Sequence, residues 1–172
     1  MFTIRPLTPS DLPAYKALRD EALRTAPEAF TSDYASSVHT PAEHYAARLG
    51  TPESGHFVLG AFDAAGELLG SIALESEQRL HKRHCANVVG MMVAPAAQKQ
   101  GIAAQLVAAC ATLARSSGQL EQLVLTVTAA NTHVVRLYER AGYVAYGLQP
   151  RAIKVAGSYY DKLHMVLHLR PM

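Results

Sequence analysis

One stretch of the sequence, residues 85–118, constrains the fold more than any other. Apolar residues fill Cys85–Val93, which is typical of a buried strand, and a turn containing a proline and a glycine follows it. A long helix comes next, and Gly118 ends it. Its apolar positions recur every three to four residues, at Ile102, Leu106, Cys110, Leu113 and Ser117. A strand that leads through a turn into a helix indicates a layered α/β structure.

The turn before this helix has two interpretations. Free N–H groups in the first turn of a helix, together with the helix dipole, bind anions such as a pyrophosphate. Gly101 would let the ligand approach the backbone, and Ala103 would leave room beside it. Alternatively, both small residues serve only tight helix packing. Gly90 favours a binding site, because a glycine in mid-strand often marks a bulge or a close approach of a ligand.

A second segment combines a strand with a short helix. The strand is predicted at residues 120–128, Asn131 follows it, and Gly142 closes the helix. Asn131 and Tyr138 are two helical turns apart and therefore point to the same side. Each has two interpretations: Tyr138 is a core aromatic or a site residue, and Asn131 is an N-cap alone or also a ligand contact.

The flanking segments complete the order β, α, α, a run of β, then β-α-β-α-β-β. Ser10 is the expected N-cap of the first helix, which has Leu12, Tyr15 and Leu18 on one side. Thr40 to Glu43 have the capping-box spacing of a second helix. The other expected strands are residues 2–7, 57–62, 68–74, 143–148 and 161–169, with a late loop over 154–161. We expect a single domain over residues 1–172, with one sheet and helices on both faces.

These two segments together resemble the GNAT N-acetyltransferases. The turn has the pattern Gln98-x-x-Gly101-x-Ala103, and the later segment has Asn131, then Tyr138, then Gly142-Tyr143. The resemblance covers residues 85–145 and implies the GNAT acyl-CoA fold, a mixed, largely antiparallel sheet. It also implies acetyl-CoA as co-substrate and these cofactor contacts: Met91, Met92, Val93, Gln98, Lys99, Gln100, Gly101, Ile102, Ala103, Ala104, Asn131 and Tyr138.

The implied reaction is acetylation of a primary amine by direct attack on the thioester. A backbone N–H near Met92 is expected to stabilise the oxyanion, and Tyr138 to act as general acid on the leaving sulfur. Many family members have a carboxylate on the cofactor strand where this chain has Val89, so the general base stays undetermined. The candidates are Glu75, His84, Tyr160 and Asp161.

Composition and charge exclude several other partners. The net charge is +2, and no run of five like charges suggests a nucleic-acid tail. No apolar run is long enough for a membrane span, and the two cysteines form no disulfide framework, so we expect a cytoplasmic protein. His164 and His168 are four residues apart on a strand pattern, about 13 Å, too far for one metal ion. The basic run Arg79 to His84 is a solvated loop or meets an anionic ligand.

Several alternatives stay open. The acceptor is either a small-molecule amine or a protein N-terminus, and the oligomeric state is either a monomer or a homodimer. A catalytically silent acyl-CoA-binding or regulatory module is the rival function, although Tyr138 argues against it. A dinucleotide-binding oxidoreductase is disfavoured, because no G-x-G-x-x-G follows the first strand.

Overall fold

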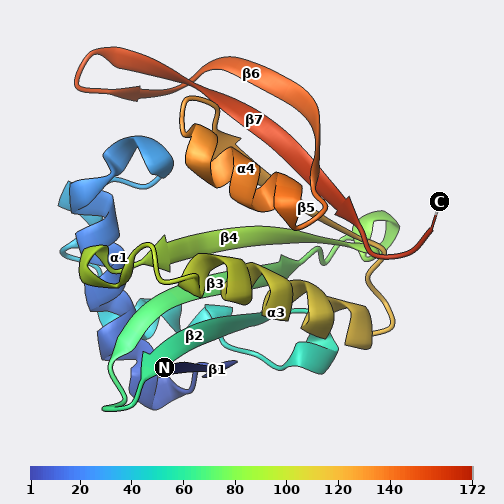
Figure 1. The fold of residues 1–172 in the computed structure, drawn as a ribbon, viewed down its shortest axis with the longest axis horizontal. Coiled ribbons are helices and arrows are strands. Elements are labelled where there is room, and N and C mark those ends of the chain that lie inside the picture. Colours follow the sequence, from blue (N-terminus) through green and yellow to red (C-terminus); the bar gives the residue numbers. More distant parts are fainter. Residues whose placement is uncertain (172) are drawn as a thin grey trace.

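The computed structural model describes residues 1–171 as a seven-stranded sheet with helices on both faces (Figure 1). The strand order is β1-β2-β3-β4-β5-β7-β6, and only the β4–β5 pair is parallel. The mixed, largely antiparallel sheet predicted from the sequence is therefore confirmed. The strands are β1 Phe2–Pro6, β2 Phe57–Asp63, β3 Leu68–Ser76, β4 Cys85–Val93, β5 Gln122–Thr128, β6 Val144–Val155 and β7 Ser158–His168.

The two faces of the sheet carry different helices. Alternate residues of each central strand point to opposite faces, so β2 buries Leu59 on one side and Val58 on the other. The Leu59 side packs against α3 (Ile102–Ser116) and α4 (Thr132–Arg140), and the Val58 side packs against α1 (Leu12–Thr25). The remaining helical turns are η1 Pro9–Asp11, η2 Pro27–Ala29, α2 Tyr34–Ser37, η3 Ala42–Arg48, η4 Pro52–Ser54, η5 Leu80–Lys82 and η6 Pro95–Ala97.

The sheet splits between β4 and β5. The two strands pair only from Cys85↔Gln122 to Asn87↔Val124, although β4 continues to Val93. The register of β4 against β3 shifts at Gly90, which has φ +59°, so the expected bulge is present. A Cβ at Gly90 would lie 3.2 Å from the Tyr15 hydroxyl oxygen, so this position has little room for a side chain. The bulge and the short pairing leave the inner edges of β4 and β5 free to line a cleft.

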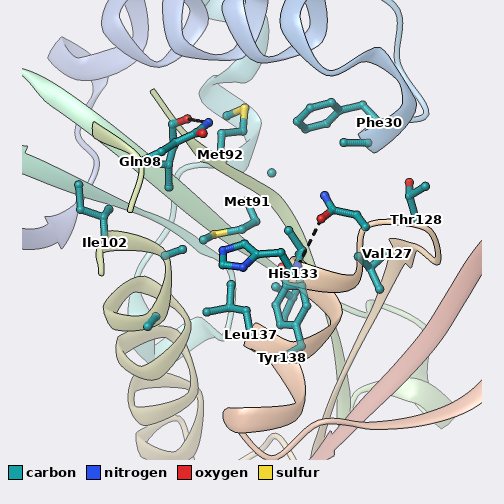
Figure 2. A pocket seen from close by; sticks show the side chains of 18 of the residues that line it. Phe30, Met91, Met92, Gln98, Ile102, Val127, Thr128, His133, Leu137 and Tyr138 are labelled. Carbon is teal, nitrogen blue, oxygen red and sulfur yellow. Dashed lines mark hydrogen bonds between the residues drawn. The ribbon is translucent and has the colours of Figure 1, made fainter. Parts of the chain in front are cut away.

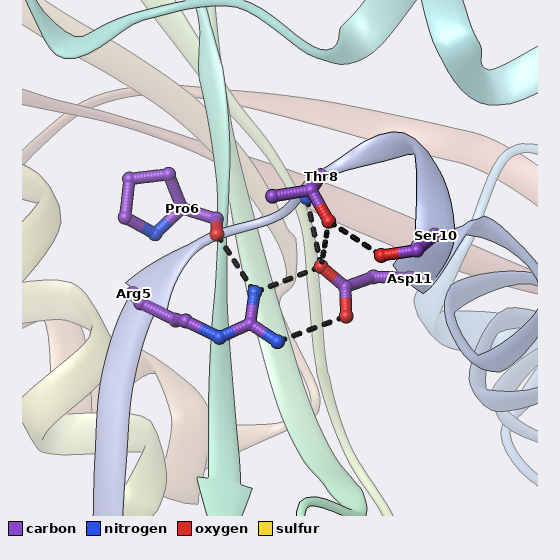
Figure 3. Close-up of polar contacts among 5 residues, drawn as sticks. All are labelled: Arg5, Pro6, Thr8, Ser10 and Asp11. Carbon is purple, nitrogen blue, oxygen red and sulfur yellow. Dashed lines mark hydrogen bonds and ion pairs between the residues drawn. The ribbon is translucent and has the colours of Figure 1, made fainter.

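The start of α1 differs from the prediction. Ser10 is not its N-cap; the Asp11 carboxylate accepts hydrogen bonds from the Thr8 N–H at 2.8 Å and from the Arg5 guanidinium (Figure 3). The Arg5 hydrogen bonds, followed by those from Thr8, hold the pKa of Asp11 well below its usual range. The Asp11 carboxylate thus contacts the backbone N–H three residues earlier in the chain, whereas the Ser10 hydroxyl makes no such contact. This hydrogen bond fixes how the chain enters α1.

The second predicted helix is also different. Residues 42–48 form the 3-10 helix η3 with Pro41 as N-cap, and no side chain caps it. The Thr40 hydroxyl instead donates to the carbonyl of Ser36 at 3.3 Å, so the capping box expected there is wrong. A Ser or Thr hydroxyl that bonds back to a carbonyl four residues earlier no longer caps the next helix.

The predicted late loop is a β-hairpin. β6 and β7 are longer than the expected strands, and they meet in a turn at Ala156 and Gly157, both with positive φ. Pro150 and a register shift between Gln149 and Ile153 interrupt the alternation that would have identified one long strand. In Figure 1 this hairpin projects along one side of the molecule, with α4 between it and β4.

Candidate active site

The main cavity, of about 610 Å³, lies in the split between β4 and β5. Its walls come from the second half of β4, the turn leading into α3, the end of β5 and the inner side of α4. Figure 2 shows Phe30 on one side of this cavity and Leu137 and Tyr138 of α4 on the other. Two segments that are remote in sequence, around residues 30 and 138, therefore border the same space.

The turn before α3 fits anion binding better than helix packing. Gly101 is the N-cap of α3 with φ +79°, and a Cβ built there would meet no atom of the described residues within 4 Å. The glycine is thus needed for its backbone conformation, not for close contact with a neighbour. The N–H groups of the first turn of α3, which begins at Ile102, have no partner within the helix. They lie at the end of the cavity, whose lining here is Gln98, Lys99, Gly101, Ile102, Ala103 and Ala104; Gln100 is exposed and does not line it.

The bulged half of β4 forms the second wall, and Met91, Met92 and Val93 all line it. The N–H of Ala94 donates to the carbonyl of Leu69 on β3 at 2.8 Å. Because successive N–H groups of a strand point to opposite edges, the Met92 N–H faces β3 and the Val93 N–H faces the cleft. The cleft edge therefore presents the polar backbone groups of Val93, next to the bulge.

Helix α4 brings Asn131 and Tyr138 to the same cavity. The Asn131 side chain accepts a hydrogen bond from the Val134 N–H at 3.4 Å, so it is both an N-cap and a cavity residue. Tyr138 is only 5% exposed and stacks edge-on against Tyr143, with ring centroids 5.4 Å apart. It is thus also both a core aromatic and a cavity residue.

The Tyr138 hydroxyl is chemically available. It makes no hydrogen bond with any of residues 1–171. Among these residues it is also not one of the fully buried polar atoms that lack a partner, so the hydroxyl oxygen keeps some exposure on the cavity side. Burial raises the pKa of this phenol, and nearby Cys110 raises it further. The group therefore stays protonated throughout the neutral range and can act as a hydrogen-bond donor toward the cavity.

Local patterns in the sequence do not predict that the segment with Ala29 and Phe30 forms part of the cavity wall. Thr128 on β5 donates to the carbonyl of Glu28 at 2.6 Å, and the Lys162 ammonium donates to the carbonyl of Ala29 at 3.2 Å. The same ammonium bonds the Thr128 hydroxyl at 3.1 Å, and burial lowers the pKa of Lys162. The hydrogen bonds to the Glu28 and Ala29 carbonyls join residues that are 100 and 133 positions apart in the sequence, so no local pattern reveals them.

Of the four candidate bases, Glu75 is the one that lines either of two cavities at the split. His84 lies at the closed end of the split, where its carbonyl accepts from the Glu121 N–H at 2.8 Å. The Asp161 carboxylate accepts from the Arg151 N–H at 2.8 Å and stabilises the irregular part of β6. Tyr160 pairs with Ile153 in the hairpin.

Glu75 belongs to a second cavity, of about 380 Å³, on the α1 face of the sheet. Glu75 follows Ala73 by two residues, so it shares the face on which Ala73 packs against α1. The two cavities share Val88, Val89 and Thr126, and therefore meet in the split. His164 lines this cavity from β7 and was not predicted as a site residue, although its alternation with buried Met165 was an available signal.

Two other sequence features lie outside these cavities. The side chains of residues 79–84 are exposed, and the Lys82 ammonium pairs with Glu77 at 3.1 Å, so the solvated-loop interpretation fits this basic run. Across residues 1–171, no three His, Cys, Asp or Glu side chains gather as a metal site. In the same residues no helix has the length and apolar character to cross a membrane.

Comparison with known proteins gives a family and a fold. Residues 15–143 match the acetyltransferase (GNAT) family, whereas no match to a curated protein reaches significance. A GNAT-family acetyltransferase from Streptococcus pneumoniae is 24% identical, with a TM-score of 0.86 over 98% of this chain and 99% of that one. A phosphinothricin acetyltransferase from Sinorhizobium meliloti in complex with AcCoA is 18% identical, with a TM-score of 0.84 over 97% and 88%.

A third relative differs in its acceptor. The ribosomal-protein-alanine N-acetyltransferase from Brucella melitensis is 23% identical, with a TM-score of 0.77 over 96% of this chain and 99% of that one. Such identities establish the fold alone. The family match, however, spans three quarters of the sequence and includes the β4–α3 turn and the whole segment from Asn131 to Tyr143. The chain thus belongs to the acetyltransferase (GNAT) family, whose enzymes carry out acetyl-CoA-dependent acetylation.

Proposed function

We propose that the chain transfers the acetyl group of acetyl-CoA to a primary amine by direct attack. The observation that carries this proposal is the split between β4 and β5, which joins an anion site at α3 to the phenol of Tyr138. In this assignment the pyrophosphate lies on the first-turn amides of α3 after Gly101. The amides of the pantetheine arm pair with the free edge of β4, as an added strand would, and Asn131 contacts the cofactor from α4.

Attack requires a neutral amine, so the acceptor ammonium first loses a proton. The nitrogen then bonds to the acetyl carbon, and the carbonyl oxygen takes the electron pair as an oxyanion. When the oxyanion collapses, the C–S bond breaks, the nitrogen loses a second proton, and the thiolate gains one. The products are an N-acetyl amine, the CoA thiol and one released proton.

The oxyanion needs a backbone donor on the cleft side of β4. The expectation from sequence was an N–H near Met92. Because the Met92 N–H faces β3, we assign this role to the cleft-facing N–H of its neighbour Val93. Such a fixed donor in a partly dry site stabilises developing charge strongly.

Tyr138 is our candidate for the general acid. Its raised pKa keeps the phenol protonated, but it also makes the phenol a weaker acid than a thiol, whose ordinary pKa is about 8.5. Complete transfer of the proton from the phenol to the thiolate is therefore uphill. We expect the hydroxyl to stabilise the departing sulfur mainly by donating a hydrogen bond, with solvent completing the protonation.

Two measurements test this function. Isothermal titration should show binding of acetyl-CoA and none of NAD; the opposite result would favour the dinucleotide rival. Release of free CoA thiol should then be followed with the standard L-amino acids, with putrescine, and with short peptides that have free N-termini. Turnover with at least one amine is expected. Acetyl-CoA binding without turnover of any amine would instead support the silent binding module.

A further inference from the structure

An arginine lies beside the bulge of β4 and next to Glu75 of the second cavity, although it is not itself among the residues that line this cavity. Arg48, at the end of η3, donates from Nη1 to the Tyr15 hydroxyl at 3.0 Å, and its Nε lies 3.5 Å from a Glu75 carboxylate oxygen. A Cβ at Gly90 would be 3.6 Å from the same Nη1. Two partners therefore hold the guanidinium next to the point where the two cavities meet. The other terminal nitrogen, Nη2, has no hydrogen bond in the part of the chain that the structure describes.

A second guanidinium lies near Arg48, outside the residues that line the cavity. Arg19 of α1 lies 5.5 Å from the centroid of the Tyr45 ring, and Arg48 lies 5.7 Å from the same centroid. Arg19 is only 7% exposed, and its Nε has no hydrogen-bond partner among the described residues. Glu75 is the acid that pairs with Arg48, and Asp20 pairs with Lys16. Glu75 is the one charged side chain among the described residues that line the cavity, and the two arginines beside it leave a net positive charge next to this lining, which suits an anionic group.

We propose that this cavity is the acceptor subsite and that the acceptor is a small α-amino acid, with its carboxylate on Arg48. This inference rests on the function proposed above. A planar guanidinium recognises a carboxylate through paired hydrogen bonds. Because Arg48 lies at the bulge, the carboxylate it holds must be close to the reacting nitrogen, as in an α-amino acid. The cavity volume of about 380 Å³ is within the range of small-molecule sites.

The opposite wall supplies a group that can take the ammonium proton. His164 lies in the cavity lining with no hydrogen bond to its ring from residues 1–171, and its ring centroid is 5.9 Å from that of Tyr146. Glu75 faces it across the cavity with Arg48 behind, and Lys162 lies two residues along the same face of β7. The proton passes from the ammonium to the imidazole, and the freed electron pair then forms the N–C bond.

The test compares each accepted L-amino acid with its amide, which has the same amine but no carboxylate. We expect the parent protein to prefer the amino acid, in kcat/KM, by roughly 10- to 100-fold. Arg48→Gln should remove most of this preference by raising the KM for the amino acid, and Arg48→Lys should restore part of it. Arg24→Gln, an exposed arginine at the end of α1, is the matched control and should leave the preference intact.

The outcomes separate the subsite from the proposed function. An unchanged affinity for acetyl-CoA shows that the Arg48 variants are folded. Efficient acetylation of the amides or of peptide N-termini, with amino acids no better, would overturn the subsite and leave the acetyltransferase assignment intact. Lack of turnover with every amine would overturn both. His164→Gln should lower kcat at neutral pH, with recovery as the pH rises or as imidazole is added; unchanged kcat would remove His164 from the proton path.

Discussion

The two faces of the split β-sheet are built in different ways. On the α3/α4 face, the proposed cofactor site uses backbone groups of β4 and of the turn at Gly101, all within about twenty residues of sequence. On the α1 face, the proposed acceptor site uses side chains from three separate elements, namely Arg48 of η3, Glu75 of β3 and His164 of β7. A backbone site depends on conformation and tolerates many sequences, whereas a side-chain site depends on the identity of each residue. This contrast explains how one fold can keep one co-substrate and vary its acceptor.

The largest effect is expected from Gly101→Glu on the cofactor face. A carboxylate at the start of α3 would face the pyrophosphate, and like charges a few ångströms apart near a surface cost several kcal/mol. We expect the dissociation constant of acetyl-CoA to rise roughly 100-fold or more in isothermal titration.

Gly101→Asn is the control for this variant. Asparagine accepts the left-handed conformation that the φ of +79° requires, and it adds no charge. It should keep most of the affinity. Equal acetyl-CoA binding by the glutamate variant and the parent protein would remove the anion site from the α3 turn.

Tyr138→Phe should keep the fold and nearly all cofactor affinity but lower the saturated rate by roughly 10- to 1,000-fold. The ring still packs against Tyr143, so only the hydroxyl is lost. Because the pKa of Tyr138 is raised, the phenol remains a hydrogen-bond donor at least up to pH 10, about the ordinary pKa of tyrosine. At any pH lower than this, the ratio of the parent rate to the variant rate should therefore not decrease as the pH rises. If the variant lost stability but kept its rate, Tyr138 would be a core residue only.

Lys162→Met tests the long-range contacts that hold the cavity wall. The substitution removes the donor to the Ala29 carbonyl and to the Thr128 hydroxyl, and should loosen the segment that carries Phe30. We expect a roughly 5-fold rise in KM, equivalent to about one hydrogen bond, with kcat unchanged. Steady-state kinetics measure both constants. Lys162→Arg keeps a donor and should lie closer to the parent, and a fall in kcat alone would contradict this positioning role.

The smallest effects are expected from the three carboxylate and imidazole candidates identified in the sequence. Neither His84→Gln nor Asp161→Asn should change turnover by more than about 2-fold, because both groups lie away from the cavities. Glu75→Gln removes a partly exposed ion pair with Arg48, and we expect turnover to fall by roughly 2- to 5-fold. Rates of the parent and of each variant should rise with pH as more acceptor amine becomes neutral. Complete loss of turnover in one folded variant would identify a dedicated base among them.

The same contrast sets how much the sequence predicted. The bounds of β4, the stop at Gly118 and the start of α4 at Asn131 follow from local rules of periodicity and capping, and the structure agrees with each. The side-chain contacts on the α1 face cannot be predicted from such local patterns, since Arg48 meets Glu75 only after the sheet has formed. The hairpin of β6 and β7 was missed because a proline and a register shift disguise its alternation. His164 was considered only as a metal ligand, although its period-two pattern with Met165 already placed it on the face of the sheet opposite to Met165.

The most direct test of this division is the change in backbone amide chemical shifts when acetyl-CoA is added to the protein. We expect the largest changes at Val93 and in the first turn of α3 after Gly101, with a smaller change at Asn131. The amides of Glu75 and His164, on the acceptor side, should move little until an amine is also present. Large shifts at Glu75 and His164 with acetyl-CoA alone, and none after Gly101, would contradict the assignment of the two substrates to opposite faces of the split.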